Sequence, residues 1–237
     1  MRHDICALLR SNPYPGRGII IGGSPDGKKA VIVYFIMGRS ANSRNRVFVI
    51  TNDGIRTQAH DPDTLADPSL VIYTPVRRIA GFDALYIVTN GDQTDTLADY
   101  LATGRTYVQA LETREFEPDP PIYTPRISGL LYRDGAYMLS ILKSADNDPA
   151  CCLRHYFTYD APIPGTCHFI HTYGGNGDPP PSFQGEPLCV KLPDGGPERI
   201  ANSIWDALDA DNKVSLYVNT VEMDSGQSEV AIINKNM

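Results

Sequence analysis

Long apolar segments are absent from this sequence of 237 residues. No run reaches the about eighteen apolar residues that a membrane-spanning helix needs, and the first residues lack the apolar centre of a secretory leader. Cysteine is also scarce. The five cysteines are an odd number without CxxC spacing, and Cys151 and Cys152 are adjacent. These features predict a reduced, cytoplasmic protein that does not bind membranes.

Positively charged residues are fewer than negatively charged ones. The chain has 21 Lys and Arg against 28 Asp and Glu, a net charge of −7. This balance argues against non-specific binding of nucleic acid or anionic membranes. A negatively charged ligand would therefore need a local group of arginines. The 42% hydrophobic content can supply a sizeable core, and no linker divides the chain, so we expect one domain over residues 1–237.

Several catalytic signatures are missing. The sequence has no GxSxG, no Walker motif and no GxGxxG, and GGNGD at 174–178 is too short to indicate a phosphate loop. Residue 2 is arginine, so removal of Met1 would not expose a nucleophilic Ser, Thr or Cys. The spacing of His168 and His171 is that of helical metal ligands. In this β-rich segment, however, residues three apart point oppositely, which disfavours a metal site. His171 is then a substrate contact or a satisfied core histidine.

Strand patterns dominate what is present. Pro-Asp-Gly and Asn-Asp-Gly turns join the first two pairs of strands into hairpins, and Asp134-Gly135 joins a later pair. Long apolar runs predict strands covered on both faces. The expected strands are 17–23, 30–38, 46–51, 55–60, 84–89, 127–133, 136–144, 152–159, 166–173, 213–223 and 228–234.

Helical patterns are few. Residues 93–101 place Leu97, Tyr100 and Leu101 on one face, and a stripe of Ile200, Ile204 and Leu208 predicts a helix within 196–212. A shorter helix is expected over 106–112. Together the patterns predict an α+β domain with sheet packed on sheet and helices outside. Its edge strands make a homo-oligomer plausible.

The segment 37–48 places arginines among small polar residues between two apolar strands. Guanidinium groups bind phosphate through a planar fork of donors, and serine and asparagine can complete such a cradle. The alternative is a solvated loop with incidental charge. The candidate anion-binding side chains are Arg39, Ser40, Asn42, Arg44, Asn45 and Arg46.

Two other segments carry acidic candidates. Glu115 and Glu117 stand two apart before a proline-rich stretch, and an extended backbone would place both carboxylates on one side. Crowded carboxylates raise one pKa and so suit proton transfer, although plain surface charge is the alternative. Asn90 and Asp92 lie between a strand and a helix, where they could contact a ribose or base, or simply cap the helix.

A phrase of four residues, Ile-Tyr-Thr-Pro, occurs at 72–75 and again at 122–125. Arginine, isoleucine, a small residue and glycine follow it both times. Proline favours an extended entry into a strand. The two phrases either project tyrosine and arginine beside one cleft or repeat a convenient strand entry by chance.

The stretches YPGRGIIIGGSPDGKKAVIVYFIMGRSANSRNRVF, REFEPDPPIYTPRISG and HFIHTYGGNGDPPPSFQGEP resemble the archaeal type of IMP cyclohydrolase, in its bacterial branch, over roughly residues 14–220. The resemblance implies a four-layer αββα sandwich similar to N-terminal nucleophile hydrolases. It implies ring closure of 5-formamidoimidazole-4-carboxamide ribotide to IMP, with loss of water and without metal or another cofactor. The partner it implies is a purine ribonucleotide with a 5′-phosphate.

The same resemblance assigns roles to residues. Glu115, Glu117, Tyr73 and Tyr123 become catalytic candidates, and the resemblance favours the interpretation in which both Ile-Tyr-Thr-Pro phrases project tyrosine and arginine beside one cleft. It places the arginine loop on the phosphate or base, and adds further substrate-binding candidates: Arg77 or Arg78, Asn90, Asp92, Thr124, Arg126 and His171. Two rival functions stay open. One is an amide hydrolase on the same fold, and the other is a purine-nucleotide-binding protein without catalysis.

Overall fold

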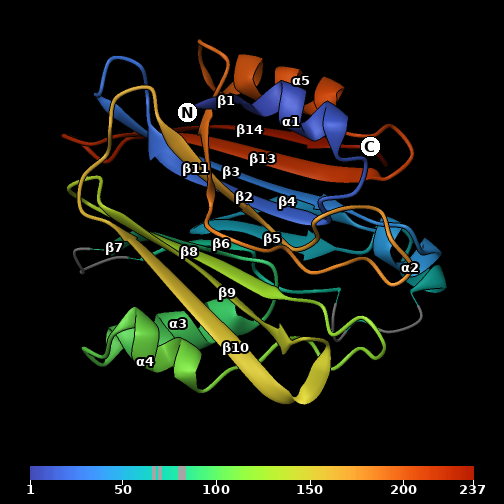
Figure 1. Ribbon diagram of the computed structural model, residues 1–237. Coiled ribbons are helices and arrows are strands. Elements are labelled where there is room, and N and C mark those ends of the chain that lie inside the picture. Colours follow the sequence, from blue (N-terminus) through green and yellow to red (C-terminus); the bar gives the residue numbers. More distant parts are fainter. Residues whose placement is uncertain (66–67, 69–70, 80–83) are drawn as a thin grey trace.

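The computed structural model describes residues 1–65, 68, 71–79 and 84–237, and its strands form two sheets packed face to face (Figure 1). Within the described residues each sheet has seven strands. The order in the first sheet is β1 (His3–Asp4), β12 (Leu188–Lys191), β11 (Cys167–His171), β2 (Arg17–Gly23), β3 (Lys29–Met37), β13 (Lys213–Glu222) and β14 (Ser228–Asn234). The order in the second sheet is β10 (Asp148–Tyr159), β9 (Tyr137–Ala145), β8 (Arg126–Tyr132), β7 (Ala84–Thr89), β6 (Val76–Arg78), β5 (Gly54–Gln58) and β4 (Val47–Thr51).

Helices cover the outer face of each sheet. Figure 1 shows α1 (Ile5–Ser11) and α5 (Pro197–Ala207) over the first sheet, and α3 (Gln93–Ala102) and α4 (Tyr107–Glu112) over the second. The short α2 (Ala41–Arg44) and a 3-10 turn at Pro62–Thr64 lie in loops. The α+β prediction is confirmed, with two sheets inside and helices outside. The part of the chain that the structure describes contains no helix long and apolar enough to cross a membrane.

Three apolar clusters explain why the central strands read as continuous hydrophobic runs. Ile19 and Ile21 of β2 belong to the cluster between the sheets, whereas Ile20 faces the cluster under α1 and α5. A third cluster, which includes Leu97 and Leu130, lies between the second sheet and α3 and α4. Because β2 is covered on both faces, each position of its apolar run is buried.

Most predicted elements form, with ends displaced by a few residues. The first hairpin pairs Gly23 with Ala30 and the second pairs Thr51 with Gly54. The sequence analysis did not predict α1, although Asp4 caps it by accepting a hydrogen bond from the Ala7 amide. It also did not predict α2, β1, β6 or β12. These elements are two to seven residues long and too short for a clear periodic pattern.

Candidate active site

A cavity of about 300 Å³ collects residues that are far apart in the sequence. It takes side chains from the start of β2, from the loop around α2, from the segment before β8 and from the end of β11. Its lining consists of Tyr14, Arg17, Arg39, Ser40, Asn42, Ser43, Arg46, Val71, Glu117, Asp119, Ile122, Thr124, Tyr173 and Pro180.

An ion pair between the two sheets forms one wall. Arg17 is the first residue of β2, and Glu117 lies in the irregular segment that precedes β8. Arg17 Nη2 is 3.6 Å from Glu117 Oε2, and the Glu117 side chain is only 3% exposed. Burial raises the pKa of Glu117 above its ordinary value, despite the nearby guanidinium groups. A carboxyl group in this setting can exchange a proton near neutral pH more readily than an exposed one.

Arg46 carries unsatisfied donors beside the same carboxylate. The residue is 1% exposed, and its Nε donates to the Ser43 carbonyl at 2.8 Å. Its Nη1 and Nη2 are buried without a hydrogen-bond partner among the described residues. Burial lowers the pKa of Arg46, while Tyr73, Tyr34 and Glu117 act in the opposite direction. Buried donors without partners are costly for the fold, which indicates an anionic or carbonyl-bearing ligand.

Two tyrosines lie next to these arginines. The hydroxyl groups of Tyr34 and Tyr73 are hydrogen-bonded at 2.8 Å in the interior. Burial raises the pKa of Tyr34 well above its ordinary value, whereas Arg17 and Arg46 favour the ionised form. The pair joins β3 of the first sheet to the chain that enters β6 of the second. The pair acts on both guanidinium groups electrostatically, since each tyrosine favours the charged form of Arg17 and of Arg46.

A chain of hydrogen bonds holds the part of the cavity lining formed by Asp119, Thr124 and Tyr173. The Thr124 hydroxyl lies 2.6 Å from Asp119 Oδ2 and 2.8 Å from the hydroxyl of Tyr173. The Thr124 amide also donates to Asp119 Oδ1 at 2.7 Å, and the Glu117 amide donates to the Thr124 carbonyl at 2.9 Å. These contacts fold the 117–124 segment back on itself. The backbone that carries Glu117 is therefore fixed without a strand.

Aromatic stacking and one arginine shape the mouth. The rings of Tyr14 and Tyr173 are stacked with centroids 5.5 Å apart, and the Arg39 guanidinium lies 4.8 Å from the Tyr14 centroid. Arg39 Nη1 also donates to Asn176 Oδ1 and to the Gly177 carbonyl. Arg39 thus ties the loop after β11 to the loop around α2. Ser40, Asn42 and Ser43 complete this more exposed side.

Only part of the predicted arginine loop lines the cavity. Arg39, Ser40, Asn42 and Arg46 line the cavity, whereas Arg44 and Asn45 do not. Arg44 is exposed and donates to the Gly38 carbonyl, and Asn45 exchanges hydrogen bonds with the backbone of Asp61. The short helix α2 turns these two side chains away. The binding roles expected for Arg44 and Asn45 are not supported by their positions.

The structure also separates the two glutamates. The prediction that their carboxylates share one side is wrong, because residues 113–125 are irregular rather than extended as a strand. Glu117 is buried in the cavity wall, and Glu115 is exposed and does not line the cavity. A proton-transfer role can therefore concern Glu117 alone.

Asn90, Asp92 and Arg126 form a network behind the cavity. Asn90 Oδ1 accepts from the Ile127 amide, and its Nδ2 donates to the Pro125 carbonyl. Asp92 stands at the amino terminus of α3 without capping it, and instead pairs with Arg126 at 2.7 Å and with Arg114. All three side chains are committed within the protein and outside the cavity lining. Arg126 still acts on Glu117 electrostatically, because it lowers the pKa that burial raises.

The two Ile-Tyr-Thr-Pro phrases enter β6 and β8, which lie on either side of β7. The end of β7 holds both phrases: the Thr89 amide donates to the Pro75 carbonyl at 2.8 Å, and Asn90 binds the Pro125 carbonyl at 2.9 Å. The repeated phrase is therefore a repeated strand entry. Residues 80 and 81, which end the longer first match, lie outside the described residues.

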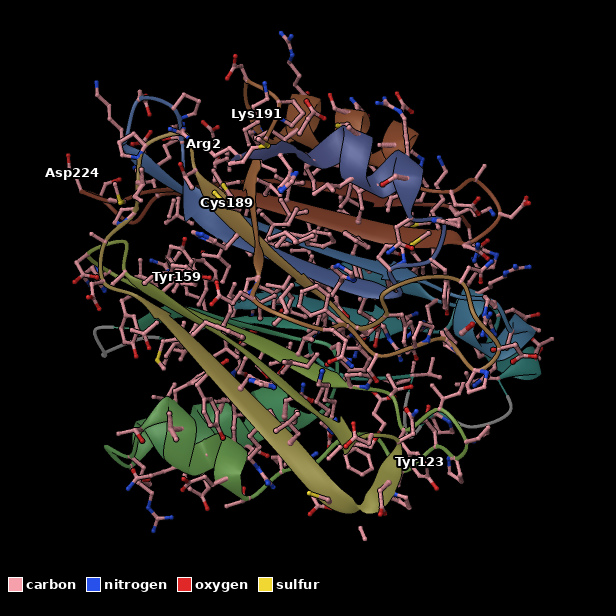
Figure 2. All side chains as sticks on the ribbon, viewed as in Figure 1. Arg2, Tyr123, Tyr159, Cys189, Lys191 and Asp224 are labelled. Atoms are coloured by element: carbon pink, nitrogen blue, oxygen red, sulfur yellow. The ribbon has the colours of Figure 1, made fainter. Side chains whose placement is uncertain are left out.

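The tyrosines of the two phrases diverge, so the prediction that both project beside one cleft is wrong. Tyr73 reaches the interior, but Tyr123 has a φ of 47° and its ring packs edge-on against Phe116. Figure 2 shows Tyr123 at the periphery of the molecule. Arg77 pairs with Asp53 and Asp95, away from the cavity, and Arg78 is exposed. Of the second phrase, Ile122 and Thr124 line the cavity.

His171 does not belong to this site. Its Nδ1 lies 2.8 Å from the Tyr173 carbonyl, to which it donates, and burial lowers its pKa to about 4. It lines a separate cavity of about 430 Å³ next to α1. Cys167 to His171 form β11, so His168 faces the opposite side, where its Nδ1 is hydrogen-bonded to the Tyr137 hydroxyl. Among the described residues no group of three or more His, Cys, Asp or Glu could hold a metal ion.

Sequence reasoning missed several lining residues. Arg17 was treated only as the first residue of an apolar strand, Tyr173 only as the last residue of the strand expected over 166–173, and Tyr14 was given no role. A charged residue at the end of a fully buried strand was an available signal for Arg17. No comparable signal marks Tyr14, Ser43, Asp119 or Tyr173, because their contacts depend on how distant segments pair.

The chain matches the family model described as "IMP cyclohydrolase-like protein" over residues 14–226, a range that contains every residue of the cavity lining. It belongs to this family. Two curated relatives are named IMP cyclohydrolase. The one from Methanopyrus kandleri is 32% identical over 125 residues, which are 52% of this chain and 59% of the relative. The one from Methanococcus maripaludis is 30% identical over 130 residues, 53% of this chain and 61% of the relative.

The matched stretch spans about three fifths of the length of these IMP cyclohydrolases. Membership of the family agrees with the resemblance inferred from the sequence. The cavity lining contains residues of both the arginine loop and the acidic segment on which the resemblance rested.

Proposed function

We propose that the protein is an IMP cyclohydrolase, which closes the ring of 5-formamidoimidazole-4-carboxamide ribotide to give IMP and water. The names of both curated relatives and the family match support this assignment. The observation that carries it is the cavity that the buried Glu117 lines together with its ion-pair partner Arg17 and the unsatisfied guanidinium of Arg46. Such a cavity combines a proton-transfer group with donors for a developing negative charge.

We infer the orientation of the substrate from the solvent exposure of the lining side chains, which falls from the mouth of the cavity to its inner end. Arg39, Ser40, Asn42 and Ser43 lie at the more exposed mouth and can hold the 5′-phosphate in contact with solvent. Glu117 and Arg46 are buried, so the reacting carboxamide and formyl groups belong at that end. A volume of about 300 Å³ is at the lower end of ordinary ligand cavities and suits one mononucleotide.

The chemistry needs two proton movements. The carboxamide nitrogen attacks the formyl carbon and loses one proton. The formamido nitrogen loses a second proton as the ring C=N bond forms and the C–O bond breaks, so the formyl oxygen leaves as water with both protons. Glu117 accepts the proton from nitrogen, and its raised pKa lets it return a proton to oxygen. Arg17 and Arg46 stabilise the oxyanion of the tetrahedral intermediate, because their donors are already oriented in a site with little water. Tyr73 does not line the cavity and acts on Arg46 electrostatically, so we give it no direct part in the proton transfers.

Two further parts of the proposal concern the fold. The layer order of helices, two sheets and helices supports an αββα sandwich of the kind found in N-terminal nucleophile hydrolases. One domain over residues 1–237 accounts for the family match, which crosses both sheets.

The amino-terminal residues stand in β1 and α1, and residues 1–13 contribute no side chain to the cavity. This disfavours an amide hydrolase that uses its terminus as nucleophile.

The test mixes purified protein with the formamido ribotide and follows IMP by its absorbance, in parallel reactions with and without added metal. We expect turnover, a strong loss in Glu117→Gln, and parental rates in the matched control Glu115→Gln. Calorimetry with IMP separates binding from catalysis. Binding of IMP without turnover would select the non-catalytic nucleotide-binding protein, and absence of both would remove the proposal.

A further inference from the structure

A third and larger cavity, of about 790 Å³, lies at the other end of β2. Arg17 at the start of β2 lines the candidate active site, whereas Gly23 at its end lines this cavity. At about 3.3 Å per residue the strand separates the two places by roughly 20 Å. The cavity contains none of the residues that the proposed cyclohydrolase reaction uses.

The cavity opens where the outer helices stop covering the first sheet. Its floor is the helix-facing side of β3, β11 and β13, with Val31, Cys167 and Thr220. Even-numbered residues of β13, such as Leu216 and Val218, belong to the cluster under the helices. Thr220 therefore points to the same side, towards the cavity. Its hydroxyl is buried without a hydrogen-bond partner among the described residues, which indicates a missing ligand.

The amino terminus of α5 provides donors at the wall. Gly195, Gly196 and Ile200 line the cavity, and the N-cap residue Gly196 has no side chain to satisfy the first turn. The free amides of a helix amino terminus, together with its dipole, favour a negatively charged group. This helix has 11 residues, which is long enough for the effect.

Two cations adjoin this helix end. Arg2 precedes β1 and Lys191 ends β12, and the two strands pair in parallel with Asp4 opposite Lys191. Figure 2 shows Arg2 and Lys191 close together on the outer side of the first sheet. Within the described residues the side chain of Lys191 makes no hydrogen bond or ion pair, and the Arg2 side chain makes one long bond of 3.4 Å to the Gly165 carbonyl. Both groups are free to bind a ligand.

The other charges of the cavity are largely committed. Lys29 pairs with Glu222 at 3.1 Å, Asp4 caps α1, and Asp26 accepts from Ser24 and the Lys28 amide. Asp194 is exposed at the rim. Glu198 in the first turn of α5 is also exposed, but it does not line the cavity. The lining therefore has two uncommitted cations, Arg2 and Lys191, against the one carboxylate of Asp194, and the volume exceeds what an isolated ion needs.

We propose that this cavity is a second ligand site, which binds the phosphoryl group of a small molecule between the α5 amino terminus, Arg2 and Lys191. The phosphoryl group accepts from the first-turn amides that follow Pro197, which itself has no N–H, and is paired by the two cations. The rest of a phosphate ester lies over the floor, where Thr220 gains a partner. This site does not depend on the proposed cyclohydrolase activity.

The test measures binding by calorimetry with two probes, inorganic phosphate and AMP, on protein with a carboxyl-terminal tag. All variants are made in an Arg46→Ala background, so that the candidate active site contributes little. We expect AMP to bind, and Arg2→Ala and Lys191→Ala each to weaken it about tenfold. Thr220→Val should weaken it less and leave the fold intact. The control Arg105→Ala removes a surface arginine beside α3 and should change nothing.

Comparison of the probes identifies the source of the phosphoryl group. Tighter binding of AMP supports a phosphate ester, and equal binding supports free phosphate. Binding that disappears with Arg46→Ala and ignores Lys191→Ala would place the probe in the candidate active site and overturn the proposal. Absence of binding at millimolar probe would overturn it too. Neither result bears on turnover of the formamido ribotide, which is measured separately.

Discussion

The carboxylate of Glu117 lies 3.6 Å from the guanidinium of Arg17, and the two residues come from the irregular segment before β8 of the second sheet and from β2 of the first. The pair exists only when β2 and the 117–124 segment are both in place. It is therefore a consequence of how the two sheets meet.

The first prediction concerns the proton carried by Glu117. Glu117→Gln should lower kcat by about 10²–10⁴, the range for loss of a general acid or base. In the parent, kcat/KM should fall as the pH decreases through the pKa of this group, which burial raises above its ordinary value. That acid limb should be absent from the residual activity of Glu117→Gln. A pH–rate profile of Glu115→Gln identical to the parent is the control, and an unchanged profile in Glu117→Gln would contradict the role.

The second prediction concerns the cost of Arg46 to the fold. Arg46→Met removes a buried charge and two unpaired nitrogens while keeping a flexible chain of similar length. The free energy of unfolding should rise by about 1–3 kcal/mol. In the same variant kcat/KM should fall by about 10²–10³, as for loss of an oxyanion donor. Urea unfolding and steady-state kinetics measure the two effects.

The exposed neighbour Arg44 supplies the control for Arg46. Arg44→Met should leave both the unfolding free energy and kcat/KM close to parental values. If Arg46→Met instead lost stability together with activity, the arginine would be a structural residue and its unpaired donors would have no bearing on the substrate.

These two residues illustrate what the sequence can and cannot predict. Arg46 was found because arginines between two apolar strands are conspicuous, and Glu117 because two glutamates stand two apart before a proline-rich stretch. The argument that placed the Glu115 and Glu117 carboxylates on one side failed, because it required an extended strand and the chain is irregular there. Arg17 gained its role only from the pairing of β2 with β3 and β11, and long-range pairing is not encoded in any local pattern.

The same distinction between local sequence signals and long-range pairing applies to the fold. Apolar runs and turn residues predicted β2, β3 and their hairpin, because these signals are local. The neighbours of β6 and β8 could not be predicted, so the repeated Ile-Tyr-Thr-Pro phrase suggested a shared cleft. The structure shows that both phrases instead anchor their strands to the end of β7.

The third prediction follows from that anchoring. Asn90→Ala would leave the Ile127 amide and the Pro125 carbonyl without their partner inside the protein. The free energy of unfolding should therefore fall by about 2–4 kcal/mol, since each unsatisfied buried group costs about 1–3 kcal/mol. KM for the ribotide should change little at a temperature where the variant is folded. A large rise in KM without loss of stability would restore the ribose-binding role predicted for Asn90.

The fourth prediction concerns the response of stability to acid. Burial lowers the pKa of His171 to about 4 in the folded protein, against about 6.5 for an unperturbed histidine. The unfolded chain therefore binds a proton as the pH falls below about 6.5, while the folded protein does not until about 4. This group stabilises the fold at neutral pH relative to acid. Between pH 7 and pH 5 it should remove about 2 kcal/mol from the unfolding free energy.

His171→Asn tests this without removing the local hydrogen bond, because the asparagine amide can donate to the Tyr173 carbonyl in place of Nδ1. The variant should lose some packing against Phe169 and Phe183 but show a shallower decline of stability from pH 7 to pH 5 in urea unfolding. His60 is exposed, so His60→Asn should keep the parental slope. Equal slopes in His171→Asn and the parent would mean that this histidine takes up its proton while folded, through an opening of the cavity beside α1.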